Sequence, residues 1–273
     1  MSVKIAGYDQ MKQQSRGRRL SSPSTHRRVP AVTRSIAILR LLGKTDAPLG
    51  VNAIATALNL IPSTCLHILR VLVHEGLVAV SKDNKLYRLD VGVVALARSS
   101  LSRSGINAQL QPVLDRLVER YPVTSVAVRP VRLEYIVVVA ISGSQLEGRI
   151  HVEIGARFPA LMSATGRCVA AFGGHSANQI REQFEKVRWD RPPSVKEWNA
   201  DVKAARKRHY SVDKDQYISG ITVIASPILD SSARLTHVLV IVGVTKQVQK
   251  VGITKIADDL RIEAERLSAE FYL

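Results

Sequence analysis

Side chains that can hydrogen-bond to the edges of DNA bases recur at helical spacing between residues 62 and 74. Serine and threonine hydroxyls can bond to bases or phosphates, and an arginine can form a bidentate contact with guanine O6 and N7. One helical face carries Ser63, His67, Arg70 and His74 at positions i, i+4, i+7 and i+11. The opposite face is apolar and carries Cys65, Leu69, Leu72 and Val73. The pattern predicts a helix that packs on one side and reads DNA on the other, with candidate contacts at Ser63, Thr64, His67 and Arg70.

The segments around this helix favour DNA binding over the simpler interpretation of a solvated helix face. Pro62 suits the first turn of a helix and Gly76 suits its end. A short helix and a three-residue turn come before it, and a hairpin with a polar turn follows it. Together these elements predict a winged helix-turn-helix. The expected helices span residues 29–42, with Ile36, Leu39 and Leu42 on one face, 51–58 and 62–75, and the expected strands span 77–80 and 86–89.

Phosphate contacts are expected from two places beside this helix. The hairpin carries Lys82, Lys85 and Arg88, whose charges suit phosphates or the minor groove rather than base reading. Ile61 offers no oxygen to cap the helix, so its first amides are left for a DNA phosphate. An Ile61→Ser change that leaves affinity and its salt dependence untouched would argue against this second contact.

The charge of the chain points to a polyanionic partner. Its 273 residues carry a formal net charge of +16, and surplus cations gain free energy by displacing counterions from phosphates. Nucleic acid is the first candidate and an anionic membrane surface is the second. No run approaches the roughly 18 apolar residues that span a bilayer. The charge is densest in residues 1–28, with seven Lys and Arg against one Asp. This segment is predicted to be a flexible basic tail, either a minor-groove arm or a solubilising segment.

Enzyme chemistry is not indicated. There is no Gly-x-Ser-x-Gly elbow, glycine-rich phosphate loop or close His pair, so we predict no catalytic residue, no cofactor and no metal. Cys65 and Cys168 lie far apart in apolar contexts, which suits a reducing compartment and a cytoplasmic protein, nucleoid-associated when bound to DNA. The alternative function is a basic architectural or RNA-binding protein without an effector, although aromatic residues make up only 5% of the chain.

The rest of the chain has the pattern of an α+β domain with a mainly antiparallel sheet, since strands follow one another through short connections with helices grouped between them. A helix over 91–104, interrupted at Gly105, is expected to link the two halves. Helices are predicted at 107–120, 163–172, 177–187, 194–209 and 253–270, and strands at 125–128, 135–141, 150–154, 221–229 and 235–244.

Several segments resemble the IclR-type family of bacterial transcription regulators. No single motif is diagnostic, but their order and spacing together are specific, and the resemblance covers nearly everything from Val29 onward. The segments are 29–35 (VPAVTRS), 38–39, 60–69 (LIPSTCLHIL), 75–78 (EGLV), 87–89 (YRL), 155–167 (GARFPALMSATGR) and 220–227.

The resemblance implies a winged helix-turn-helix at 29–90 and a linker helix with a GAF-like effector-binding domain at 91–273. It also implies double-stranded operator DNA and a small-molecule effector as partners, in a homodimer or a homotetramer. Effector binding would shift the population of subunit arrangements, and coupling would pass through the 91–104 helix. Carried over by position, the pocket residues are Leu161, Met162, Ser163, Ala164, Thr165, Gly166, Asp213, Ile221, Val223, Val240 and Val242.

The pocket positions depart from the family pattern in a way that predicts the effector class. Val223, Val240 and Val242 stand where relatives that sense small acids often have Cys, Ser and Ser, and Arg167 stands where a Lys is usual. Valines cannot satisfy a small buried carboxylate. We therefore expect a larger hydrophobic or aromatic organic acid, its carboxylate bound by amides of residues 163–166. The alternative is that these valines are ordinary core residues of the sheet.

Overall fold

The computed structural model describes residues 29–45, 47–102, 106–142, 150 and 152–271. The described residues divide into two compact units, one ending with the helix over 92–102 and one beginning at Ile106. The basic tail at 1–28 and the helix break at Gly105 lie outside the described residues.

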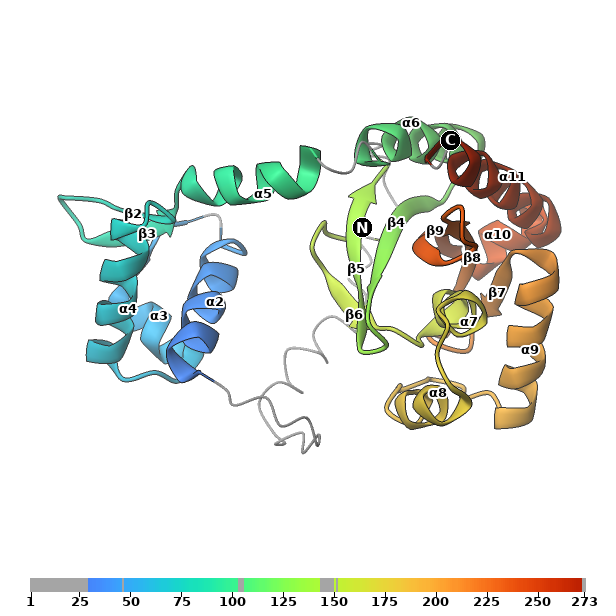
Figure 1. The fold of residues 1–273 in the computed structure, drawn as a ribbon, viewed down its shortest axis with the longest axis horizontal. Coiled ribbons are helices and arrows are strands. Elements are labelled where there is room, and N and C mark those ends of the chain that lie inside the picture. Colours follow the sequence, from blue (N-terminus) through green and yellow to red (C-terminus); the bar gives the residue numbers. More distant parts are fainter. Residues whose placement is uncertain (1–28, 46, 103–105, 143–149, 151, 272–273) are drawn as a thin grey trace. The chain divides into compact units, whose positions relative to one another are not determined.

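The N-terminal unit contains the three predicted helices and the predicted hairpin, with one further strand in the sheet, and it ends with a fourth helix, α5 (Figure 1). The strand order is β1-β3-β2, and β3 pairs with both neighbours. Its core joins apolar residues of all three helices and the hairpin, with Ile38, Ile54 and Leu69 fully buried. The elements are α2 (Pro30–Leu42), β1 (Leu49–Gly50), α3 (Val51–Leu58), α4 (Pro62–His74), β2 (Val78–Val80), β3 (Leu86–Leu89) and α5 (Gly92–Ser102).

The C-terminal unit is built on a six-stranded antiparallel sheet, in the order β6-β5-β4-β9-β8-β7. This confirms the α+β class. The helices are α6 (Ile106–Arg120), α7 (Ser163–Phe172), α8 (Ala177–Phe184), α9 (Val195–Arg208), α10 (Thr245–Val251) and α11 (Ile253–Phe271). The strands are β4 (Thr124–Val131), β5 (Tyr135–Ile141), β6 (Arg157–Pro159), β7 (Ser211–Lys214), β8 (Ile221–Leu229) and β9 (Leu235–Val244).

Strand alternation divides this unit into two cores. Residues such as Ile224 and Ile241 point to the face covered by α6 and α11, which lie side by side (Figure 1). Their neighbours Val223 and Val240 point to the opposite face, which α7 covers. A period of two along each strand therefore assigns every second residue to the α7 side.

Three expectations about elements are wrong in detail. Ile36 is 40% exposed, and Ile38 takes the buried position on α2 instead. Of the strand expected at 150–154, the described residues 150 and 152–154 are not in a strand. The edge of β5 is paired with residues 155–159 instead: Gly155 N donates to Val138 O, and β6 continues the pairing. The strands β1, β6 and β7 and the helix α10 were not predicted; the three strands have only two, three and four residues.

The core contains a histidine that predicts a pH dependence of stability. His237 on β9 is 8% exposed, and burial with the nearby Arg129 charge lowers its pKa from 6.5 to about 4. Protonation therefore favours the unfolded chain. With the imidazole neutral, the folded protein keeps its full free energy of unfolding above pH 6.5, and it loses part of that free energy as the pH falls toward 4. We expect urea unfolding to show up to about 3 kcal/mol of acid destabilisation from this group, absent in His237→Gln. Parallel pH profiles of the two proteins would contradict it.

Candidate nucleic-acid interface and ligand site

The start of α4 is set by backbone geometry rather than by a side-chain cap. Asn59 adopts a left-handed conformation with φ of 52°, which ends α3 and turns the chain. The bend between α3 and α4 is 113°. Pro62 occupies the first turn of α4, and Ile61 before it provides no side-chain cap. The first amides of α4 are therefore available to an external acceptor.

The predicted reading face of α4 points outward. Ser63, His67, Arg70 and His74 are exposed, whereas Thr64 is only half-buried at the edge of this face. The opposite face is buried through Cys65, Leu69 and Leu72. The exposed face also contains Val71, at 59% exposure, which the sequence reading missed because valine fits the core pattern equally well.

The hairpin presents cations next to α4. Lys82, Lys85 and Arg88 are all exposed, and Lys85 has a left-handed backbone with φ of 53°. The turn is closed by hydrogen bonds from Ser81 N to Leu86 O and from Lys85 N to Ser81 O. Within the described residues, none of these three cations forms an ion pair, so their charges remain available to phosphates.

The predicted pocket residues of the C-terminal unit lie together on the α7 side of the sheet. Leu161, Ala164, Val223 and Val240 belong to one buried cluster, with Met162, Ile221 and Val242 packed at its margin. The sheet register brings Val223 opposite Val242. Three polar members of the predicted set, Ser163, Thr165 and Asp213, are also buried.

The glycine in this set is required by close packing. A Cβ on Gly166 would lie 2.1 Å from the carbonyl carbon of Leu161, so α7 can approach this loop only because residue 166 has no side chain. Ser163 at the start of α7 has φ of 51°, a strained conformation for a residue other than glycine. The first turn of α7 is thus held close to the backbone before it.

Gly166→Ala should separate α7 from this loop. We expect a loss of about 1–3 kcal/mol in the free energy of unfolding, because the clash is with backbone and cannot be relieved by a rotamer change. Thermal melting followed by circular dichroism measures the loss. Gly50→Ala is the matched control, since its Cβ would meet only Leu86 Cδ2 at an ordinary 3.7 Å. Equal melting temperatures for the two variants would contradict the packing argument.

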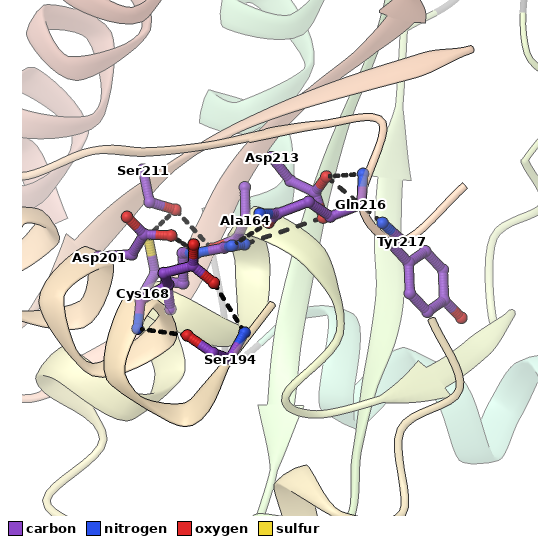
Figure 2. Close-up of polar contacts among 10 residues, drawn as sticks. Ala164, Cys168, Ser194, Asp201, Ser211, Asp213, Gln216 and Tyr217 are labelled. Atoms are coloured by element: carbon purple, nitrogen blue, oxygen red, sulfur yellow. Dashed lines mark hydrogen bonds and ion pairs between the residues drawn. The ribbon is translucent and has the colours of Figure 1, made fainter. Parts of the chain in front are cut away.

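A buried arginine, noted in the sequence only as a departure from the family's lysine, lies beside Asp213. Its acidic partners Asp201 and Asp213 are labelled in Figure 2. Arg167 has no exposed surface; its Nε donates to Asp201 Oδ2 at 3.0 Å and its Nη2 donates to Gln216 Oε1. Its Nη1 lies 3.8 Å from Asp213 Oδ2, and neither of these two atoms has a hydrogen-bond partner. Asp213 Oδ1 accepts from the amides of Gln216 and Tyr217. A buried ionic cluster with unsatisfied atoms therefore adjoins the apolar site.

One aromatic ring lies near the arginine, and a second packs against that ring. The guanidinium carbon of Arg167 lies 5.9 Å from the ring centre of Trp189, which packs edge-on against Tyr217. Burial, together with Asp190 and Asp213, raises the pKa of Tyr217 to about 12. The indole nitrogens of Trp189 and Trp198 are buried without partners. The arrangement suits a ligand with both a flat apolar part and hydrogen-bonding groups.

The described residues contain no group of three or more side chains that could hold a metal ion. The Cys168 thiol is fully buried, and burial raises its pKa to about 12, so it does not offer a thiolate nucleophile at neutral pH. Nor is any single described helix long and apolar enough to cross a membrane; by length and composition alone, the bent pair α3 and α4 passes that test.

Comparisons with known proteins match both halves of the chain. Residues 98–269 match the family described as bacterial transcriptional regulator IclR C-terminal, and residues 31–81 match the IclR helix-turn-helix domain. A glycerol operon regulatory protein of Streptomyces coelicolor is 28% identical over 229 residues, which cover 83% of this chain and 89% of that protein. The probable transcriptional regulator SauR of Cupriavidus necator is 24% identical, covering 91% and 99% of the two chains.

Solved structures show the same fold. The IclR transcriptional regulator from Alicyclobacillus acidocaldarius has a TM-score of 0.73 at 22% identity, covering 89% of this chain and 98% of that one. An IclR homologue from Microbacterium hydrocarbonoxydans, solved in complex with 4-hydroxybenzoate, has a TM-score of 0.71 at 17% identity, covering 88% and 98%.

Proposed function

The chain belongs to the IclR family of bacterial transcriptional regulators, and from that premise we propose that it is a sequence-specific operator-binding protein controlled by a hydrophobic or aromatic organic acid. The observation that carries the DNA-binding part is the exposed face of α4. In this proposal Ser63, Thr64, His67 and Arg70 contact base edges. Lys82, Lys85 and Arg88 contact phosphates or the minor groove.

The DNA-binding proposal is tested by an electrophoretic shift on the duplex upstream of the chain's own gene. RNA of equal length is the competitor. We expect the duplex to be shifted at protein concentrations that leave the RNA free, because the helix reads a major groove that A-form RNA does not open to side chains. Equal shifts of both would favour the alternative, a basic architectural protein without an effector.

The effector proposal places the ligand between α7 and strands β8 and β9 in the C-terminal unit, which we take to be a GAF-like domain. Its support is the apolar cluster around Val223 and Val240, two side chains that offer no hydrogen bond to a small carboxylate, and the aromatic side chains beside it. The relative solved with 4-hydroxybenzoate agrees with this class of ligand, although at 17% identity it establishes only the fold.

Calorimetry with a small panel tests the effector class. The panel comprises 4-hydroxybenzoate and benzoate as aromatic acids, pyruvate and glyoxylate as small oxoacids, and glycerol as a polyol. We expect binding of an aromatic acid and weak or no binding of the oxoacids. Tight binding of an oxoacid with none of an aromatic acid would show that the effector class is wrong.

The proposal also includes a homodimer, with a possible pairing of dimers into tetramers. Its support is an exposed apolar stripe on α2: Val29, Val32 and Ile36 are 57%, 59% and 40% exposed and lie at i, i+3 and i+7. A stripe of this kind on a helix is typical of an association surface. A dimer would present two α4 helices to half-sites about one turn (~34 Å) apart.

A further inference from the structure

The strongest unassigned feature of the molecule is the pair of unsatisfied atoms at Arg167 and Asp213. Both side chains are almost fully buried, at 0% and 1% exposure. A buried donor or acceptor without a partner is costly, and native proteins nearly always satisfy such atoms with protein, water or ligand. Here Arg167 Nη1 is a donor and Asp213 Oδ2 is an acceptor, 3.8 Å apart.

A single oxygen atom that both accepts and donates can satisfy this pair. Hydrogen bonds of about 2.8 Å from one oxygen can reach two atoms that are 3.8 Å apart. A hydroxyl group meets this requirement, since it accepts from Nη1–H and donates its own hydrogen to Oδ2. A carboxylate can only accept, so it would leave Asp213 Oδ2 unsatisfied and facing a second negative charge.

The charge balance of the cluster also disfavours an anion at this point. The guanidinium of Arg167 is shared by two carboxylates, those of Asp201 at 3.0 Å and Asp213 at 3.8 Å. Asp201 is partly exposed, whereas Asp213 is buried. A ligand carboxylate placed next to the buried Asp213 carboxylate would be strongly repelled by it. The arginine is therefore already neutralised and does not attract the carboxylate of a ligand.

We propose that Arg167 Nη1 and Asp213 Oδ2 together bind a hydroxyl group of the effector, which makes this protein selective for hydroxylated organic molecules. The inference rests on the proposed function, because it takes the C-terminal unit to bind a small molecule. It assigns the hydroxyl to the Arg167–Asp213 pair and leaves a carboxylate, where the ligand has one, to the first turn of α7. There the buried Ser163 hydroxyl oxygen also has no partner.

Access to this pair requires movement of the segment between α8 and α9. Trp189 lies over Arg167, and the backbone that follows Trp189 is hydrogen-bonded to the loop after β7. Asp190 N donates to Tyr217 O at 3.3 Å, and Arg191 N donates to Gln216 O at 2.9 Å. These contacts close the site in this structure, so a ligand must separate the two loops as it enters. Hydroxyl recognition and loop opening are thereby linked.

Matched ligands that differ by one group test the proposal. In the aromatic arm, 4-hydroxybenzoate, benzoate and terephthalate carry a hydroxyl, a hydrogen and a carboxylate at the same ring position. In the polyol arm, glycerol and propane-1,3-diol carry hydroxyl groups without a ring or a carboxylate. We expect 4-hydroxybenzoate to bind about 10- to 100-fold more tightly than benzoate, the contribution of one hydrogen bond to charged groups. Terephthalate should bind least.

Two substitutions identify the residues responsible. Asp213→Asn keeps the Oδ1 acceptor for the amides of Gln216 and Tyr217 but replaces the Oδ2 acceptor and its negative charge by an NH2 donor. It should bring the ratio between hydroxylated and unsubstituted ligand close to one and improve terephthalate binding. Arg167→Lys should also lower the ratio. Arg206→Lys is the control, because Arg206 on α9 donates to Ala171 O on α7, the helix of Arg167, but lies outside the cluster. This substitution should leave the ratio unchanged.

The outcomes separate this inference from the function on which it rests. Equal affinity for 4-hydroxybenzoate and benzoate, or an unchanged ratio between them in folded Asp213→Asn, would overturn the hydroxyl site and leave the effector class standing. If only the polyols bind, and if Asp213→Asn and Arg167→Lys lose that binding, the result would support the hydroxyl site and overturn the proposal of an aromatic effector. If no ligand binds in either arm, both are wrong.

Discussion

Arg70→Ala is expected to cost about 1–3 kcal/mol of discrimination between the operator and other sequences, the range for one bidentate contact to a guanine. Arg70 is exposed on α4 and forms no ion pair among the described residues, so its guanidinium is free to reach a base edge. Residues 29–90 carry only seven Lys and Arg against four Asp and Glu, which is too small an excess for a generic basic clamp. Specificity must then rest on a few side chains.

The measurement is fluorescence anisotropy with an operator selected by the purified protein from random duplexes. Arg70→Ala should weaken binding to the operator about 5- to 150-fold while changing binding to a scrambled duplex much less. Lys82→Ala is the control for a phosphate contact: it should weaken both duplexes alike and reduce the dependence on salt. If Arg70→Ala behaves like Lys82→Ala, then Arg70 contacts a phosphate and does not read a base.

The recognition helix could be predicted closely because its limits are set by local chemistry. Pro62 marks the start of α4 and Gly76 follows its end, and the apolar positions between them have helical spacing. The helix found, 62–74, therefore nearly matches the predicted span. The edge strands could not be predicted in this way. β1 has two residues, and its pairing with β3 depends on contacts that no local pattern encodes. The segment at 150–154 has the alternation of a strand, yet residues 155–159 occupy the edge of β5.

Asp213 was predicted as a residue of the proposed ligand site, but its pairing with Arg167 could not be predicted, for a different reason. Arg167 is brought together with Asp201 and Asp213 only by the packing of α7 against α9 and β7. A signal was present nonetheless. Arg167 is the only charged residue in α7, whose other members from Ser163 to Phe172 are small or apolar, so the helix offers no polar face on which an arginine could be solvated. Such an arginine is buried and needs acidic partners from elsewhere.

Val32→Asp combined with Ile36→Asp is expected to abolish the proposed dimer and to reduce operator affinity about 10²- to 10⁴-fold. Both side chains lie on the exposed apolar stripe of α2, and two carboxylates placed there would face their own copies across a two-fold interface. The loss is large because a dimer binds the second half-site intramolecularly. Sedimentation measures the association state, and anisotropy with the full operator measures the affinity.

Val195→Asp is the matched control for this double variant. Val195 is 56% exposed at the start of α9, so it has nearly the exposure of Val32 but lies in the other unit. The control should remain dimeric and bind the operator as the parent protein does. A double variant that sediments as a dimer would place the interface elsewhere.

Arg70→Ala and the α2 double variant should lose DNA binding in different ways if α2 forms the dimer interface and α4 reads the base sequence. On a DNA duplex that holds a single half-site, the dimer gains no intramolecular advantage, so the α2 double variant should bind as tightly as the parent protein and keep its preference over scrambled DNA. Arg70→Ala should lose that preference on the same duplex. A loss of half-site preference in the α2 variant would mean that α2 also positions α4, whose core packing it shares through Ile38 and Leu42.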